Sequence, residues 1–215
     1  MIQVVSFDIG GTLIQHGNTP SLVDIISQET GLDTQWVKTK VKACFVENRR
    51  SINTFCEEIG YRDSERIARI IHSLSKKRPA YLFDDVRETL DEIKAKGFRL
   101  VTLSNKACWN DVCLADYGLD SLFELELYSF HIGVSKPGPE MFRYVEHVMD
   151  VQPDNIIHVG DSLTSDVRGA NQAGWHSVWI RRNSSIRSDR GPPLHEAKYC
   201  VSSLHEIIDI IMRIK

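Results

Sequence analysis

The sequence has few cysteines and no long hydrophobic segment. None of its apolar runs approaches the roughly 18 residues that are needed to span a membrane. The N-terminal apolar run reaches Asp8 too soon for a secretory signal. The 5 cysteines are widely dispersed, and Cys108 and Cys113 lack the CxxC spacing and the nearby histidine pair of a zinc site. We therefore expect a cytoplasmic protein with reduced thiols and no membrane partner.

The sequence also lacks a strong charge of either sign. Its 215 residues carry a net charge of -3, and the lysines and arginines are mostly scattered. General attraction to nucleic acid or to an anionic membrane surface is therefore not expected. The glycine-rich phosphate loop GxxxxGK(S/T) is missing as well. The hydrophobic fraction of 42% suits a single core or a core with a smaller attached lobe.

Short apolar runs alternate with amphipathic stretches over most of the chain. The runs typical of strands cover residues 2–7, 99–103, 156–159 and 176–180, with weaker candidates at 124–129 and 199–201. The stretches between them predict helices at 84–96, 109–116, 139–148, 165–173 and 204–214. This alternation predicts an α/β fold, in which a Rossmann-like parallel sheet carries helices on both faces.

The segment from residue 18 to residue 79 interrupts this alternation. It contains no convincing strand, and its apolar periodicity predicts helices at 21–30, 34–47, 52–59 and 64–76, with Gly31 and Gly60 as helix stops. We expect an all-helical cap domain at 18–79, with 76–79 as its return linker, inserted into a core domain formed by 1–17 and 80–215. The arginine-rich stretch 181–193 is expected to be an exposed loop.

Polar residues follow several of the predicted strands at the point where each strand ends. In open parallel sheets, ligands bind outside the carboxyl ends of the strands. We therefore expect one edge of the sheet to gather these residues, together with the lysine of a Lys-Pro pair: Asp8, Gly10, Gly11, Thr12, Ser104, Asn105, Lys136, Asp161 and Asp166.

This group of residues suits the chemistry of phosphate. Oxygen ligands such as Asp8, Asp161 and Asp166 are those that Mg²⁺ prefers, and the cation would lower the repulsion between a phosphate and Asp8. The Ser104 hydroxyl, the Lys136 ammonium and the turn amides near Gly11 could hold the phosphoryl oxygens. Asp8 would then be phosphorylated and later hydrolysed, which is covalent catalysis by a carboxylate.

Four motifs resemble those of the haloacid dehalogenase superfamily, most of whose members are phosphatases. In chain order they are residues 8–12 (DIGGT), 101–105 (VTLSN), 133–137 (GVSKP) and 160–166 (GDSLTSD). The match covers nearly the whole chain, and the helical insert resembles the first type of cap in this superfamily. The resemblance implies a hydrolase with a magnesium cofactor and a cap that excludes water and selects a small phosphorylated substrate.

The resemblance also implies roles for individual residues. Asp8 would be the nucleophile and a metal ligand, and the further metal ligands would be the Gly10 carbonyl, Asp161 and Asp166. Ser104 and Lys136 would act in catalysis by gripping the phosphate. The predicted substrate-binding residues are Gly11, Thr12, Ser104, Asn105 and Lys136.

The sequence departs from the superfamily pattern at Gly10, where a second aspartate usually acts as acid and base. Loss of a positioned acid/base typically costs ~10²–10⁴-fold in rate. Three explanations remain open. Another group, such as His16, could supply the proton. The leaving group could be acidic enough to depart unaided, as in an acyl or aryl phosphate. Alternatively, the protein could bind a phosphorylated ligand or another protein without turnover.

Other chemistries are less well supported by the sequence. The dehalogenating branch also lacks the second aspartate, but it does not use the acidic metal pair. The phosphonate-cleaving branch uses a cap lysine, for which the candidates here are Lys38, Lys40 and Lys42. Residues 8–12 also resemble a phosphate loop of actin-like sugar kinases, but such kinases need two large lobes. The sequence defines neither the substrate nor the oligomeric state. The candidate specificity residues of the cap are Trp36, Phe45, Arg49 and Arg50.

Overall fold

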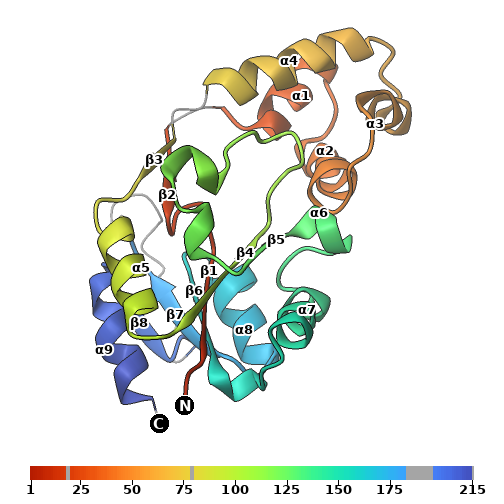
Figure 1. The fold of residues 1–215 in the computed structure, drawn as a ribbon. Coiled ribbons are helices and arrows are strands. Elements are labelled where there is room, and N and C mark those ends of the chain that lie inside the picture. The colour runs from red at the N-terminus through yellow and green to blue at the C-terminus, as the bar shows by residue number, and fades with distance from the viewer. Residues whose placement is uncertain (18–19, 78–79, 183–195, 215) are drawn as a thin grey trace.

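The computed structural model describes residues 1–17, 20–77, 80–182 and 196–214. Its centre is a six-stranded sheet in the order β5-β4-β1-β6-β7-β8, and all neighbouring strands are parallel (Figure 1). The strands are β1 (Val4–Phe7), β4 (Arg99–Ser104), β5 (Leu125–Tyr128), β6 (Ile156–Gly160), β7 (His176–Ile180) and β8 (Tyr199–Val201). The predicted Rossmann-like α/β fold is therefore confirmed, and the two weaker strand candidates form the two edges.

Helices cover both faces of this sheet. On one face, α5 (Val86–Ala95) and α9 (His205–Arg213) pack against β1 through residues such as Leu90 and Ile207. On the other face, α7 (Pro139–Met149) and α8 (Gly169–Gln172) enclose a second cluster that includes Phe142. Strands buried on both faces are mostly apolar, which accounts for the hydrophobic runs in the sequence. No described helix is long and apolar enough to cross a bilayer.

The helical segment between β2 and β3 has a hydrophobic cluster of its own. It consists of α1 (Leu22–Thr30), α2 (Thr34–Val41), the π-helix η1 (Lys42–Val46), α3 (Ile52–Ile59) and α4 (Ser64–Lys77). Their apolar faces meet in a core that contains Ile26, Phe45, Phe55 and Ile67. Helices α1 and α3 end at Gly31 and Gly60, as predicted. Of the predicted return linker, Lys76 and Lys77 belong to α4, and residues 78 and 79 lie outside the described residues.

A two-stranded antiparallel ribbon joins the helical segment to the sheet domain, and the sequence did not predict it. It pairs β2 (Ile14–His16) with β3 (Ala80–Leu82), so that His16 lies opposite Ala80. Strands of three residues are too short to show an alternating pattern, which explains the omission. Of the loop predicted at 181–193, the part from residue 183 onward lies outside the described residues.

The helix predicted at 109–116 is wrong. Only a 3-10 turn, η2 (Leu114–Tyr117), forms there, and the preceding residues are a loop. The Cys108 amide donates to the Phe45 carbonyl at 2.8 Å, and the Trp109 side chain packs against the core of the helical segment. Tertiary contacts therefore override the local helical preference. The remaining short elements are α6 (Ser129–Ile132), η3 (Asp120–Leu122), η4 (Pro153–Asn155) and the π-helix η5 (Leu163–Arg168).

Candidate active site

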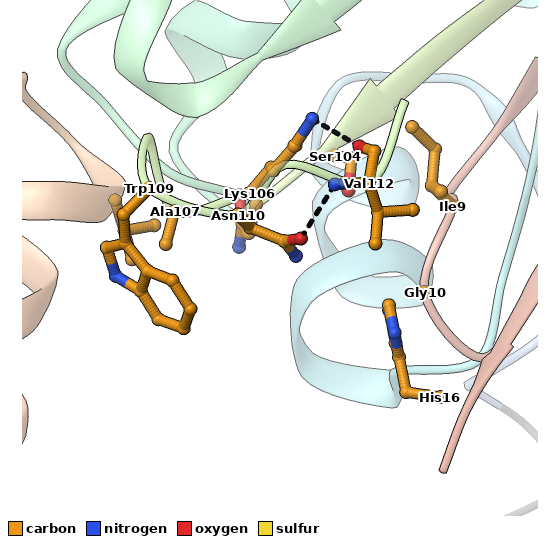
Figure 2. Close-up of a pocket in the computed structure, with 11 residues that line it drawn as sticks. Ile9, Gly10, His16, Ser104, Lys106, Ala107, Trp109, Asn110 and Val112 are labelled. Atoms are coloured by element: carbon orange, nitrogen blue, oxygen red, sulfur yellow. Dashed lines mark hydrogen bonds between the residues drawn. The ribbon is translucent and has the colours of Figure 1, made fainter. Parts of the chain in front are cut away.

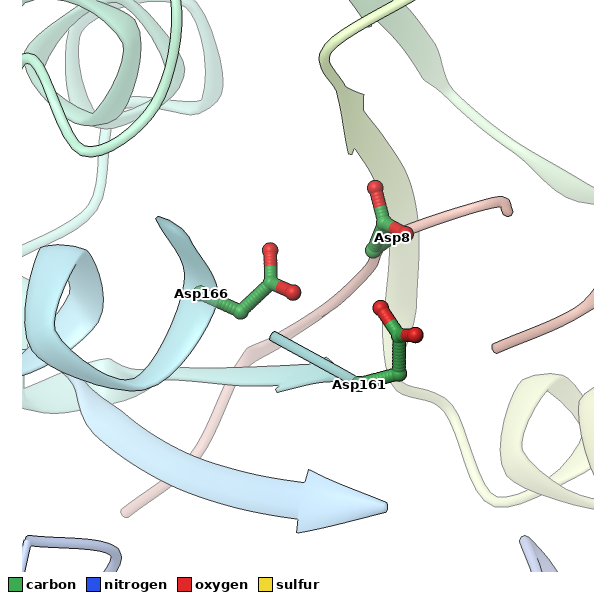
Figure 3. Close-up of side chains that lie close together, drawn as sticks. All are labelled: Asp8, Asp161 and Asp166. Carbon is green, nitrogen blue, oxygen red and sulfur yellow. The ribbon is translucent and has the colours of Figure 1, made fainter. Parts of the chain in front are cut away.

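Three carboxylates meet at the carboxyl edge of the sheet. Asp8 directly follows β1, Asp161 directly follows β6, and Asp166 lies on η5. Each offers an oxygen within 4.8 Å of the other two, and Figure 3 shows the three side chains facing a shared space. The structure thus brings together the three aspartates that the sequence predicted as metal ligands. Asp8 and Asp166 are buried, and Asp161 is partly exposed.

The Lys136 ammonium lies between two of these carboxylates. Its Nζ donates to Asp8 Oδ1 at 2.8 Å, to Asp166 Oδ1 at 2.6 Å and to the Leu103 carbonyl. Burial alone would lower the pKa of Lys136, but the charges of Asp166 and Asp8 outweigh it and raise that pKa. Lys136 is therefore a permanent cation at the floor of the site, placed where the sequence predicted it.

Burial and the neighbouring charges shift the pKa values of the groups in this cluster. Burial raises the pKa of Asp8 in spite of Lys136, whereas Lys136 and His158 overcome burial and lower the pKa of Asp166. Burial also lowers the pKa of His158, so that its imidazole is neutral near pH 7. Among the residues that the structure describes, the cluster holds three carboxylates, and two of them bond to the Lys136 ammonium. This excess of oxygen ligands and negative charge fits a divalent cation.

Two glycines make room for these carboxylates. A Cβ on Gly11 would lie 2.4 Å from Asp161 Oδ2, and a Cβ on Gly160 would lie 2.2 Å from Asp166 Cγ. Gly11 also has a φ of +81°, which side-chain-bearing residues adopt only at a cost. The glycines at these two positions are therefore needed for the close approach of backbone and carboxylate.

A second set of contacts holds the charged groups in place. His158 Nε2 lies 3.1 Å from Asp166 Oδ1, and its Nδ1 lies 2.9 Å from the Ser6 hydroxyl. The Asn105 side chain donates to the Lys136 carbonyl at 2.9 Å and accepts from the Lys136 amide at 2.7 Å. Asn105 was predicted to bind substrate. That role stays a prediction, and the bonds observed fix the backbone that carries the ammonium.

The structure places Gly11 and Thr12 inside the loop after β1. The Gly11 amide donates to the Ile14 carbonyl at 2.8 Å, and the Thr12 side chain is fully buried. The Thr12 carbonyl accepts from Arg182, at 2.8 Å from Nη2. Neither residue is among the described residues that line the adjacent pocket. Their expected contact with the phosphate stays a prediction, and the contacts observed shape the loop.

A pocket of about 250 Å³ lies beside the cluster, between the sheet edge and the helical segment. His16 and Gly10 line one side of it and Trp109 the other, with Ser104 and Asn110 between them (Figure 2). Its remaining lining residues are Ile9, Val46, Asn105, Lys106, Ala107 and Val112. The structure thus brings Gly10 and Ser104 to one cavity, as the sequence predicted.

The pocket lining includes Lys106 and Asn110, which were not predicted from the sequence. Lys106 Nζ donates to the Val112 carbonyl at 2.5 Å and lies 4.6 Å from the centre of the Tyr128 ring, and Asn110 Oδ1 accepts from the Val112 amide. Burial lowers the pKa of Lys106. The signal that could have found Lys106 is its position directly after Ser104 and Asn105 at the end of a strand.

The four candidate specificity residues of the helical segment lie away from this pocket. Phe45 belongs to the core of the segment, and Trp36 is 40% exposed. Arg50 pairs with Glu58 at 2.5 Å. Arg49 stacks on Phe130, with 4.4 Å between its Cζ and the ring centre, and bonds to His131. None of the four is among the described residues of the pocket lining.

The parallel sheet and the acidic cluster at its carboxyl edge define an α/β protein with an aspartate-based site. Residues 2–174 match the family model of haloacid dehalogenase-like hydrolases, and the chain therefore belongs to this family. The predicted resemblance is thus confirmed.

Individual relatives include two phosphatases. The chain is 27% identical over 235 residues to glyceraldehyde 3-phosphate phosphatase of Methanopyrus kandleri, covering 98% of this chain and 97% of that protein. It is 26% identical over 224 residues to phosphoglycolate phosphatase of Colwellia psychrerythraea, with coverage of 98% and 97%. A solved 2-haloacid dehalogenase from Pseudomonas syringae pv. Tomato has a TM-score of 0.66 at 22% identity over 99% of each chain, which shows a shared fold.

Proposed function

We propose that this protein is a magnesium-dependent phosphatase that hydrolyses a small phosphorylated metabolite through an aspartyl-phosphate at Asp8. The observation that carries the proposal is the cluster of Asp8, Asp161 and Asp166 next to a pocket, with the Lys136 ammonium bonded to Asp8 and Asp166. The phosphatase names of the full-length relatives support the same reaction class. A cytoplasmic location stays a prediction of the sequence.

The residues of the site suggest how the reaction proceeds. A carboxylate oxygen of Asp8 attacks the phosphorus, and the ester oxygen leaves on the opposite side. Lys136 holds Asp8 through the 2.8 Å contact and offers positive charge where the phosphoryl group arrives. Ser104 ends β4 at the pocket wall, where its hydroxyl can donate to a phosphoryl oxygen. Water then hydrolyses the aspartyl-phosphate.

The metal site proposed for Mg²⁺ consists of Asp8, Asp161, Asp166 and the Gly10 carbonyl. The ion would supply Lewis-acid neutralisation of the phosphate charge, so that one anion can approach another. Within the protein, Gly11 and Gly160 leave the space that Asp161 and Asp166 occupy. His158 fixes the orientation of Asp166, which keeps the second oxygen of that carboxylate bonded to the Ser162 amide at 2.9 Å.

The size of the pocket favours a small substrate. Its volume of about 250 Å³ lies below the roughly 300–1,000 Å³ that is usual for sites of drug-sized ligands. We propose that the helical segment acts as a cap over it. Glu47 of that segment accepts from the Ser135 hydroxyl at 2.8 Å, and the Val46 carbonyl accepts from the Ser129 hydroxyl at 2.6 Å. These contacts hold the cap closed next to Lys136 and keep water from the intermediate.

The second candidate function is binding or regulation without turnover, and Gly10 is the observation that favours it. A glycine there has no side chain to protonate a leaving group. Phosphonate cleavage has less support, because it needs a cap lysine in the pocket. Lys40 pairs with Glu58 at 3.1 Å, Lys42 pairs with Glu47 at 3.1 Å, and Lys38 is exposed. None of the three is among the described lining residues.

Substitution of the nucleophile separates these functions. We expect Asp8→Asn to abolish phosphate release from small phosphate esters while the protein still binds a phosphate mimic such as tungstate. The matched control is Asp120→Asn, because Asp120 is exposed on η3, away from the site. Release of phosphate by Asp8→Asn at the rate of the control would show that another group is the nucleophile. Binding of the mimic without turnover by the unmodified protein would favour the binding function.

A further inference from the structure

The imidazole of His16 lies beside Gly10, the position that carries the second aspartate in the usual superfamily motif. A Cβ built on Gly10 would lie 3.4 Å from His16 Nε2 and 3.7 Å from its Cδ2. Gly10 and His16 line the same pocket as Ser104, and Figure 2 shows the ring next to Gly10. The edge of the imidazole therefore borders the volume into which a side chain at position 10 would extend.

The loop after β1 brings His16 back to this place. The Gly11 amide donates to the Ile14 carbonyl at 2.8 Å, and the Ile14 amide donates to the Ile9 carbonyl at 2.9 Å. Strand β2 then pairs with β3, and His16 lies opposite Ala80. Both ends of the turn are thus fixed by backbone hydrogen bonds. The fold therefore holds His16, six positions after Gly10, at the same side of the pocket as Gly10.

His16 is also better placed than Lys106, the other ionisable residue of the described pocket lining, to replace a group at position 10. Of the described residues that line the pocket, His16 and Lys106 are the two with ionisable side chains. Lys106 directs its Nζ to the Val112 carbonyl and to the Tyr128 ring, on the loop after β4. His16 lies on β2, which directly follows the loop that carries Asp8 and Gly10. This is the side from which a group at position 10 would reach an oxygen bonded to the reacting phosphorus.

We propose that His16 is the proton donor and acceptor of the reaction, in the place that Gly10 leaves empty. The inference rests on the proposed phosphatase function. In the first step a bond forms between Asp8 and phosphorus, the bond to the ester oxygen breaks, and that oxygen takes the proton of His16 Nε2 and leaves as the alcohol. In the second step the neutral Nε2 takes a proton from water. The water oxygen bonds to phosphorus, the bond to Asp8 breaks, and phosphate is released with His16 protonated again.

The test compares leaving groups in His16→Ala, His16→Gln and the natural protein. A missing proton donor matters for an alkyl phosphate, whose alkoxide is a poor leaving group, and matters little for an acyl or nitrophenyl phosphate. We expect both variants to lose ~10²–10⁴-fold in kcat/KM on alkyl phosphates and about 3-fold or less on nitrophenyl phosphate. The matched control is His72→Ala, since His72 is exposed on α4. An equal loss on all substrates, or no loss on any, would overturn the proposal.

A rescue experiment excludes a merely structural role of His16. In the His16→Ala background the space beside position 10 is open, so Gly10→Asp can place a carboxyl group there. We expect Gly10→Asp to raise the alkyl-phosphatase activity of His16→Ala by at least about 10-fold, towards that of the natural protein. Absence of any rescue, with tungstate still bound, would overturn the proposal.

The two proposals fail in different ways. If the natural protein releases phosphate only while Asp8 is present, but His16→Ala changes no leaving-group dependence, the role of His16 is wrong and the phosphatase function stands. If the natural protein releases no phosphate from any ester, both proposals are wrong.

Discussion

Substitution of Gly11 by alanine tests whether Asp161 must approach the loop after β1. A Cβ at this position would lie 2.4 Å from Asp161 Oδ2, whereas an ordinary contact begins at 3.4 Å, so the carboxylate must move by about 1 Å. A displacement of ~1 Å in a reacting group can cost about 10²-fold in rate. Gly11→Ala is therefore expected to lower kcat/KM for phosphate release by about 10²-fold and to weaken the binding of Mg²⁺.

Gly97→Ala provides the matched control. Gly97 has a φ of +88°, close to the +81° of Gly11, but nothing lies within 4 Å of its Cβ position. Both variants carry the conformational cost of alanine in the left-handed region, roughly 1–2 kcal/mol. For a protein of this size each kcal/mol lowers Tm by about 2–4 °C. We expect similar losses of Tm in differential scanning fluorimetry, with loss of activity in Gly11→Ala alone. Equal activity of the two variants would refute the requirement for close approach.

Three further outcomes are expected. The pKa of Asp85 is lowered, although burial opposes it, because Arg182 and Ser203 hydrogen bond to the carboxylate. A carboxylate whose folded pKa is depressed contributes stability above its ordinary pKa of 3.8. Asp85→Asn should therefore lower the free energy of unfolding by about 1–3 kcal/mol at pH 7, and in urea titrations the difference from the natural protein should shrink below about pH 4. Asn105→Ala removes both bonds to the Lys136 backbone, so kcat/KM should fall about 10-fold or more, measured as phosphate release. Mg²⁺ at 100 times its Kd should stabilise the protein by about 2.7 kcal/mol, seen as a rise in Tm that a chelator reverses.

The sheet and the acidic cluster could be predicted because each depends on local pattern and one rule of topology. Apolar runs in the sequence predicted the six strands. The residues that directly follow parallel strands lie together at the carboxyl edge of the sheet. Asp8 and Asp161 were therefore predictable from their positions after strands, whereas Lys136 was recognised by its Lys-Pro pair. The depression of the pKa of Asp166 was not predictable, because it requires the 2.6 Å contact with Lys136 and the support of His158.

Features that arise from contacts between distant segments could not be predicted from the sequence. The loop that carries Trp109 was taken for a helix, since nothing local indicates that the Cys108 amide bonds to Phe45. The bond between the Asn105 amide and the Lys136 carbonyl, 31 residues away, was also not predicted. His16 was one of three explanations for Gly10. Its place beside that glycine depends on a turn and a ribbon too short to show a pattern.

Trapping of the phosphorylated enzyme tests the central claim most directly. Borohydride reduces an acyl phosphate to an alcohol, so an aspartyl-phosphate becomes homoserine, which mass spectrometry of the digested protein locates. During turnover of a phosphate ester with Mg²⁺, we expect homoserine at position 8, and none after chelation of the metal. Steady release of phosphate with Asp8 unmodified, or with the label on another residue, would contradict the claim.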